Sequence, residues 1–239
     1  MFSIIWYIKF WIRVFCYFPV YNTVKKLAAQ GKMEEHDRIT RQIVKEFGQK
    51  SIGYAKGEVQ LKGMENFPSK PVVYVANHRS YFDIPLILGY LGDEAIPIVA
   101  KYELQSMPII SKWMKELNCV FLNRKDPREA IKNINQAIKL VKSGNSMVVF
   151  PEGTRSKDEN LLEFKSGAFR IAEKAKVNVV PLCIFNTATM MGTKGLKISS
   201  GKIALKILPQ IDTSNYTKDD WKNLPELCEN LIRKGLKEL

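Results

Sequence analysis

Two residues suited to acid–base chemistry lie close together, directly after a short apolar run. His78 and Asp83 belong to the stretch NHRSYFD at 77–83, and the run VVYVA before it is typical of a buried strand. The ends of such strands commonly carry the site residues of α/β proteins. Residues five apart on one helix diverge by about 140°. His78 and Asp83 can therefore meet only if His78 lies on the turn and Asp83 begins the next helix. Asp83 would then hold one imidazole nitrogen and leave the other free as a general base.

A structural interpretation of the same residues is equally supported by this motif alone. Ser80 and Asp83 have the spacing of a capping box, and a single histidine is often structural. The sequence has no GxSxG motif, so the usual serine nucleophile of α/β-hydrolases is missing. A catalytic base here would have to activate a hydroxyl group of the substrate.

The stretch FPEGTRS at 150–156 favours the catalytic interpretation. It follows another strand-like run, and Gly153 permits a close backbone approach, so that main-chain N–H groups can point at an anion or a developing oxyanion. Arg155 adds a planar, permanently charged group that suits phosphate.

Two further cations follow strand-like runs in the same way. Lys101 follows IPIVA at 96–100, and Arg124 follows CVFL at 119–122. Each cation taken singly is ordinarily a solvated strand end. Three of them at strand ends, beside a His–Asp pair, predict a pocket for a phosphate ester.

With these motifs the sequence resembles the 1-acylglycerol-3-phosphate acyltransferase family, the PlsC-like lysophosphatidate acyltransferases. The resemblance covers about residues 57–210, and an N-terminal membrane-binding helical segment is also typical of that family. His78 and Asp83 match the family's HxxxxD block, and FPEGTRS is a full match to its third block. Residues 100–104 with 120–124 resemble the second block, although many members carry Asp where this chain has Asn123, and residues 180–182 resemble the fourth.

The resemblance implies transfer of a fatty acyl group from a thioester to the sn-2 hydroxyl of 1-acylglycerol 3-phosphate, which gives phosphatidic acid. His78 would be the general base, and Asp83 would fix its tautomer and orientation. The residues that it places in the substrate site are Lys101, Arg124, Glu152, Gly153, Thr154 and Arg155. Lys101 and the two arginines would hold the glycerol phosphate. The backbone amides of 152–154 are candidates for the oxyanion hole. Acyl-CoA or acyl carrier protein would be a co-substrate, and no metal or bound cofactor is expected.

Two other functions fit parts of the sequence. The first is an acyltransferase of the same superfamily that uses glycerol 3-phosphate or another lysophospholipid. The second is a non-enzymatic basic module that binds membranes, which would explain the charge but neither His78 with Asp83 nor FPEGTRS. Nucleic acid is not expected as a partner, because no RRM-like, zinc-finger or bZIP signature is present.

The elements that must position these residues are short strands alternating with helices. We predict strands at 58–62, 72–76, 96–100, 119–122, 146–150, 178–184 and 202–208. The pattern indicates an α/β fold with a mixed, mostly parallel sheet flanked by helices. A helix is predicted over 127–143, with Asp126 as N-cap, Gly144 as its stop, and a buried stripe at 131, 134, 138 and 141.

The first 56 residues are predicted to form a helical membrane-associating segment, ahead of an α/β acyltransferase domain at 57–239. Residues 1–21 are apolar and rich in aromatic side chains, and Lys9 and Arg13 share one helical face. This favours a helix lying in the membrane interface, with Lys9 and Arg13 on the headgroups and Trp and Phe side chains below. A helix packed on the protein's own core and a tilted single span are the alternatives.

Composition limits the partners and the compartment. The 239 residues carry a net charge of +13, which suits an anionic membrane surface or an anionic acyl carrier. The four cysteines form no CxxC pair, which fits a reducing compartment, and two histidines exclude a multi-histidine metal site. We therefore expect a monotopic protein on the cytoplasmic face of a membrane.

Overall fold

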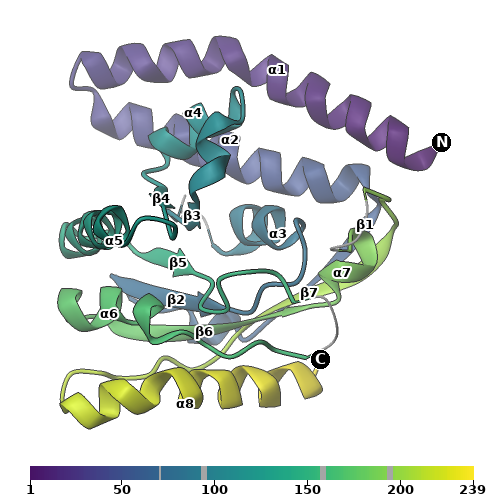
Figure 1. Ribbon diagram of the computed structural model, residues 1–239. Helices are drawn as coiled ribbons and strands as arrows, with labels where there is room; N and C mark the ends of the chain where they lie inside the picture. The colour runs from purple at the N-terminus through teal and green to yellow at the C-terminus, as the bar shows by residue number, and fades with distance from the viewer. Residues whose placement is uncertain (70, 93–95, 157–159, 193–195) are drawn as a thin grey trace.

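The computed structural model describes every residue of the chain except 70, 93–95, 157–159 and 193–195. The helices are α1 (Phe2–Ala29), α2 (Met33–Tyr54), α3 (Asp83–Tyr90), α4 (Ile110–Glu116), α5 (Pro127–Lys142), α6 (Arg170–Ala175), α7 (Thr187–Met190) and α8 (Lys218–Lys237). The strands are β1 (Gly57–Lys62), β2 (Val72–Ala76), β3 (Val99–Lys101), β4 (Val120–Leu122), β5 (Met147–Val149), β6 (Asn178–Phe185) and β7 (Gly201–Ile207). A strand forms at each of the seven predicted places, although the one predicted at 96–100 is shorter and begins later, at Val99. Figure 1 shows how the strands alternate with helices.

Five strands form the central sheet, in the order β1–β7–β6–β2–β5. Neighbouring strands are parallel except for β6 and β7, which are antiparallel. β3 and β4 form a separate parallel pair, and a bridge between Ile98 and Val148 joins this pair to β5. The predicted mixed, mostly parallel sheet is confirmed. Because β2 and β5 are parallel neighbours, the stretches that follow them, 77–83 and 150–156, leave the same edge of the sheet.

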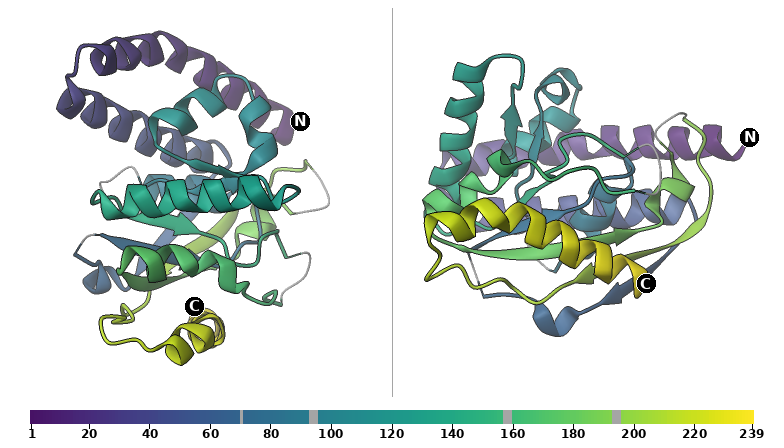
Figure 2. Two further views of the ribbon diagram at one scale, coloured as in Figure 1. Left: turned by 60° about the vertical axis from the view of Figure 1, so that its left-hand side comes forward. Right: turned by 60° about the horizontal axis from the view of Figure 1, so that its bottom comes forward.

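Helices cover both faces of this sheet. β2 directs Val72, Tyr74 and Ala76 into one core, and Val73 and Val75 into the other. The first core continues into α1, α2 and α3, and the second into α5, α6 and α8. Figures 1 and 2 show α1 with α2 on one side of the sheet and α8 on the opposite side. Burial on both faces explains why residues 72–76 are continuously apolar.

The predicted helix over 127–143 forms as α5, and the Asp126 side chain accepts bonds from the amides of Arg128 and Glu129. Its predicted stripe is wrong at one position. Ile138 and Val141 are buried, but Ile131 is 55% exposed and Ala137 is fully buried. Near the N-terminus of α5, the face that packs on the sheet therefore differs from the face that the spacing of the isoleucines predicted.

α1 and α2 form a helical hairpin, and Arg13 of α1 makes polar contacts with α2. Arg13 forms an ion pair of 3.1 Å with Glu46 of α2 and a hydrogen bond with the Tyr54 hydroxyl. Lys9 Nζ lies 5.7 Å from the centroid of the Tyr54 ring. Arg13 is therefore paired within the protein instead of pointing at headgroups as predicted. Lys9 is exposed beside the Tyr54 ring, and its contact with headgroups stays a prediction.

The outward side of α1 is apolar instead. Its exposed large side chains are Phe2, Ile4, Ile5, Ile8, Ile12, Phe15 and Phe18. Trp6 and Tyr17 are buried in the protein, and Trp6 Nε1 donates to the Ser51 carbonyl at 2.9 Å. Aliphatic and phenylalanine side chains, rather than tryptophan, thus form the outer face. By length and composition α1 alone among the described helices could cross a membrane.

Two further contacts hold the hairpin to the rest of the molecule. The backbones of α2 and α3 touch at Gly48 and Gly89, where a β-carbon on Gly48 would lie 2.5 Å from the Gly89 nitrogen. Buried His36 of α2 bonds the Asp37 carboxylate at 2.8 Å and the Glu116 carboxylate of α4 at 3.1 Å. Burial lowers the pKa of His36, but the bonds to Asp37 and Glu116 raise it by more, so the pKa lies above its ordinary value.

Candidate active site

His78 and Asp83 form the pair that their spacing predicts. Asp83 is the first residue of α3, and His78 lies on the turn that leaves β2. The distance from His78 Nδ1 to Asp83 Oδ2 is 2.7 Å. With Nδ1 occupied in this way, Nε2 is left for a substrate.

The Asp83 carboxylate is fully buried and held by four donors. Oδ2 accepts from His78 and from the backbone amides of Arg79 at 2.7 Å and Ser80 at 2.9 Å. Oδ1 accepts from the Thr187 hydroxyl of α7 at 2.5 Å. Hydrogen bonds of this kind compensate for the desolvation of a buried charge. The carboxylate is therefore fixed in one orientation.

The His78 side chain, unlike that of Asp83, is partly exposed to solvent. Its side chain is 19% exposed, whereas that of Asp83 is inaccessible. One face of the ring stacks on Phe150, with the two centroids 4.3 Å apart and an angle of 30° between the planes. A group that is both oriented and reachable can exchange a proton with a bound substrate.

Glu152 joins the loop after β5 to the turn after β2. Its Oε1 accepts from the His78 amide at 2.6 Å, and its Oε2 accepts from the Leu162 amide at 2.9 Å. The Ser156 amide in turn donates to the His78 carbonyl at 2.9 Å. Burial raises the pKa of Glu152, while the two backbone bonds oppose that shift. Glu152 is thus a brace between the two motifs rather than an open ligand.

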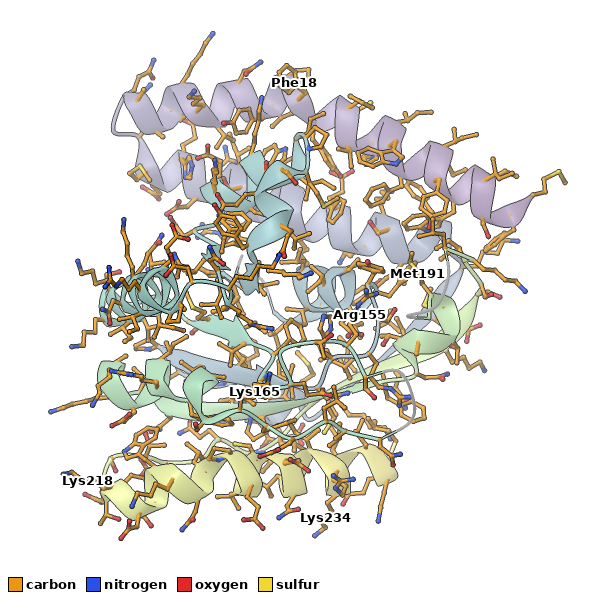
Figure 3. All side chains as sticks on the ribbon, in the orientation of Figure 1. Phe18, Arg155, Lys165, Met191, Lys218 and Lys234 are labelled. Atoms are coloured by element: carbon orange, nitrogen blue, oxygen red, sulfur yellow. The ribbon has the colours of Figure 1, made fainter. Side chains whose placement is uncertain are left out.

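Two cations approach Gly153. Arg124 Nη1 donates to the Gly153 carbonyl, and partial burial lowers the pKa of Arg124 from its ordinary value, against the attraction of Glu103. A β-carbon on Gly153 would lie 2.9 Å from Arg124 Nη1 and 3.5 Å from Lys165 Nζ. Its φ of +75° also favours glycine. The loop therefore keeps two positive groups close to one backbone position. Figure 3 labels Lys165 and Arg155, which both come from the segment between β5 and α6.

Arg155 lies against an aromatic ring. Its guanidinium carbon is 3.6 Å from the centroid of Tyr81, a residue within the HxxxxD stretch. Its Nη1 is buried and has no hydrogen-bond partner among the residues that the structure describes. A buried donor without a partner is costly, and an anionic ligand would satisfy it.

The remaining predicted residues are more peripheral. Lys101 is 71% exposed and lies 3.7 Å from Glu103, and no contact joins it to His78 or Arg155 within the described part of the chain. Thr154 is exposed. The Gly153 amide donates to the Phe150 carbonyl at 3.1 Å. The backbone amides of 152–154 as oxyanion-hole donors stay a prediction. Across the described residues, no group of three or more His, Cys, Asp or Glu side chains could hold a metal ion.

Sequence reasoning assigned no role to three residues that build the site, although Asn77 belongs to the motif at 77–83. Asn77 is fully buried and exchanges two hydrogen bonds with the backbone of Ile184, which ties β2 to β6. Thr187 holds the second oxygen of Asp83, and Lys165 flanks Gly153. Thr187 follows a predicted strand, which is the one signal that could have found it. The position of Lys165 depends on the course of the loop after residue 156, which no local pattern fixes.

Comparisons with known proteins agree with this geometry. A family model described as "Acyltransferase" matches residues 58–185. The 1-acyl-sn-glycerol-3-phosphate acyltransferase of Saccharomyces cerevisiae is 35% identical over 76% of this chain and 61% of its own length. The human 1-acyl-sn-glycerol-3-phosphate acyltransferase alpha is 31% identical over 85% of this chain and 70% of its own length.

A solved structure is similar over nearly the whole chain. The crystal structure of the 1-acyl-sn-glycerophosphate (LPA) acyltransferase PlsC from Thermotoga maritima superposes with a TM-score of 0.80 and 28% identity, covering 97% of this chain and 95% of that one. The chain spans less than two thirds of several curated relatives, 61% of the yeast protein and 38% of a chloroplast relative from Arabidopsis thaliana. By the family match, the relatives and the shared fold, the chain belongs to the acyltransferase family that contains the 1-acyl-sn-glycerol-3-phosphate acyltransferases.

Proposed function

We propose that this protein transfers a fatty acyl group from acyl-CoA or acyl carrier protein to the sn-2 hydroxyl of 1-acylglycerol 3-phosphate, giving phosphatidic acid. The observation that carries the proposal is the 2.7 Å contact between His78 and a fully buried Asp83 at the carboxyl edge of the sheet. The names of the relatives support the choice of acceptor.

In the proposed reaction His78 Nε2 takes the proton of the acceptor hydroxyl as its oxygen attacks the thioester carbonyl. The negative charge of Asp83 stabilises the imidazolium that forms. When the tetrahedral intermediate collapses, the C–S bond breaks, and the proton passes from the imidazolium to the departing thiolate. The products are the new ester and the free thiol of the carrier, and the base is restored.

The phosphate of the acceptor would bind beside this base. Arg124 and Lys165 flank Gly153, and Arg155 has a buried N–H group without a partner among the described residues. Arginine can contact phosphate through two parallel hydrogen bonds, which fixes its orientation as well as its position. Such a group of cations favours a phosphorylated acceptor over a neutral lysolipid.

The test is an acyl-transfer assay by mass spectrometry, with acyl-CoA and acyl carrier protein as donors and a panel of acceptors. We expect phosphatidic acid from lysophosphatidate, and little product from glycerol 3-phosphate or lysophosphatidylcholine. His78→Ala should abolish the reaction, whereas Tyr216→Leu, far along the chain before α8, should not. Preferred use of another acceptor would reassign the substrate. If the protein binds vesicles but transfers no acyl group to any acceptor, it would instead be a non-enzymatic membrane-binding module.

The protein should meet its lipid substrate through the outer face of α1. This face is apolar along much of the helix, and the opposite side packs on α2. A crossing orientation would carry α2 into lipid together with its many charged residues, which is costly. These observations support a helix lying in the interface, with apolar side chains buried in the acyl region.

Flotation with vesicles tests this surface. Replacing Ile8 and Phe15 with Asn should weaken binding about 100-fold, because each buried side chain contributes about 1.5 kcal/mol. Ile131→Asn on α5 is a matched control, since Ile131 is exposed to the same degree as Ile8. Because Arg13 is paired with Glu46 and the large exposed side chains of α1 are apolar, added salt should have only a small effect. Undiminished flotation of the double variant would place the membrane contact elsewhere.

A further inference from the structure

We propose that Tyr81 is a positioning residue for the phosphate-binding guanidinium of Arg155. The inference rests on the proposed function, because it assumes that Arg155 contacts the phosphate of the acceptor. Tyr81 is one of the four residues between His78 and Asp83, and nothing in the HxxxxD spacing requires a tyrosine there.

The geometry of the contact is that of a cation on an aromatic face. The guanidinium carbon of Arg155 is 3.6 Å from the centroid of the Tyr81 ring, well inside the range of about 6 Å for such pairs. The ring is 51% exposed, so it does not belong to the core. Its removal should therefore leave the fold intact. The guanidinium of Arg155 lies over its ring, and the Tyr7 hydroxyl of α1 is also close enough to interact electrostatically with Tyr81.

Stacking has a specific consequence for the arginine. A ring that covers one face of a guanidinium leaves its N–H edges available, and these edges are the parts that bind phosphate oxygens. Nη1 is already buried and without a partner among the described residues. Tyr81 would thus hold Arg155 in its binding orientation before the acceptor arrives, which lowers the entropy cost of binding.

The position of Tyr81 also relates the phosphate site to the base. Tyr81 is three residues from His78 on the same turn, and the backbone of this turn is fixed by Asp83 and Glu152. The short segment between His78 and Tyr81 therefore sets the distance between the His78 imidazole and the Arg155 guanidinium. The acceptor phosphate and its reacting hydroxyl have to match that separation.

Steady-state kinetics with a short-chain, soluble lysophosphatidate test the proposal. Tyr81→Leu should raise the KM for this acceptor about 2- to 30-fold, the range expected for loss of one cation–π contact. The KM for acyl-CoA should not change. Tyr81→Phe keeps the aromatic face and should restore most of the loss. Tyr216→Leu, whose ring packs on Trp221 instead of a cation, is the control.

A double-mutant cycle separates this role from a general one. If Tyr81 acts through Arg155, Tyr81→Leu should add nothing to the KM in an Arg155→Ala background. Additive effects, or a rise in the acyl-CoA KM, would overturn the proposal. So would an unchanged acceptor KM in Tyr81→Leu. Wild-type enzyme that forms no phosphatidic acid would instead overturn the proposed function, so the two failures are distinguishable.

Discussion

Replacing Asp83 with Asn removes a charge while keeping the shape of the side chain. Oδ2 accepts three donors, from His78 and from two backbone amides, so this position must remain an oxygen. The new NH₂ group then faces Thr187, whose hydroxyl can turn from donor to acceptor. The amide oxygen still accepts the His78 Nδ1 proton, so the tautomer of His78 is retained. The loss of activity should therefore come from the missing charge alone.

The size of that loss follows from the contact distance. An imidazolium and a carboxylate whose charges are about 4 Å apart attract by about 4 kcal/mol at an effective dielectric constant of about 20. In Asp83→Asn the neutral hydrogen bond between the amide oxygen and His78 Nδ1 remains, and it offsets about 1 kcal/mol of this loss. The transition state should thus be destabilised by about 3 kcal/mol, which lowers kcat about 100-fold.

Single-turnover and steady-state assays of acyl transfer check this value. We expect kcat to fall about 100-fold, with the KM of both substrates and the thermal midpoint close to those of the unmodified protein. Asp83→Ala should also unfold more easily, because it leaves the amides of Arg79 and Ser80 buried without an acceptor. Activity of Asp83→Asn within threefold of the unmodified protein would mean that Asp83 only organises the turn, and the dyad would be refuted.

Three further predictions test other parts of the molecule. Arg124→Ala and Arg155→Ala should lower kcat/KM for lysophosphatidate much more than for a lysolipid without a terminal phosphate, and Lys at either position should rescue only partly; equal losses on both acceptors would remove these residues from the phosphate site. Glu152→Gln should cost about 1–3 kcal/mol in chemical denaturation, because one of two backbone amides loses its acceptor; unchanged stability would mean that the brace is dispensable. His36→Asn should destabilise the protein at pH 6 and much less at pH 9. The reason is that the raised pKa of His36 stabilises the fold below about pH 6.5, and this stabilisation is lost as the pH rises through the folded-state pKa. A loss of stability that does not depend on pH would contradict the interaction of charged His36 with Asp37 and Glu116.

Local patterns were sufficient for the sheet and for the dyad. Apolar runs that end in polar turn residues mark strands buried on both faces, and the strand end fixes His78 at the site edge. The turn between His78 and Asp83 is short, so its geometry is constrained by the five-residue spacing. The residues of FPEGTRS could likewise be recognised as a motif, but their position beside His78 depends on β5 being the parallel neighbour of β2, which no local pattern gave.

Long-range contacts could not be predicted in the same way. Whether Arg13 faces lipid or protein depends on Glu46, which lies 33 residues away and on another helix. The burial of Trp6 means that removing residues 1–21 would also remove part of the core, so surface substitutions are the better test of membrane contact. Thr187 approaches Asp83 from a separation of 104 residues, which only the fold as a whole determines.

Gly48 and Gly89 allow α2 and α3 to pack backbone to backbone, with no layer of side chains between them that could slide. α3 begins at Asp83, and α2 carries α1 along its length. The apolar face of α1 and the His78–Asp83 pair are therefore joined through α2 and α3 and should move together. On a bilayer this connection would set a constant height for His78 above the lipid, because the protein could not lower the imidazole toward a deeper hydroxyl. An acceptor would have to rise to that height, so lysolipids would be selected by how far their hydroxyl projects from the membrane as well as by their charge.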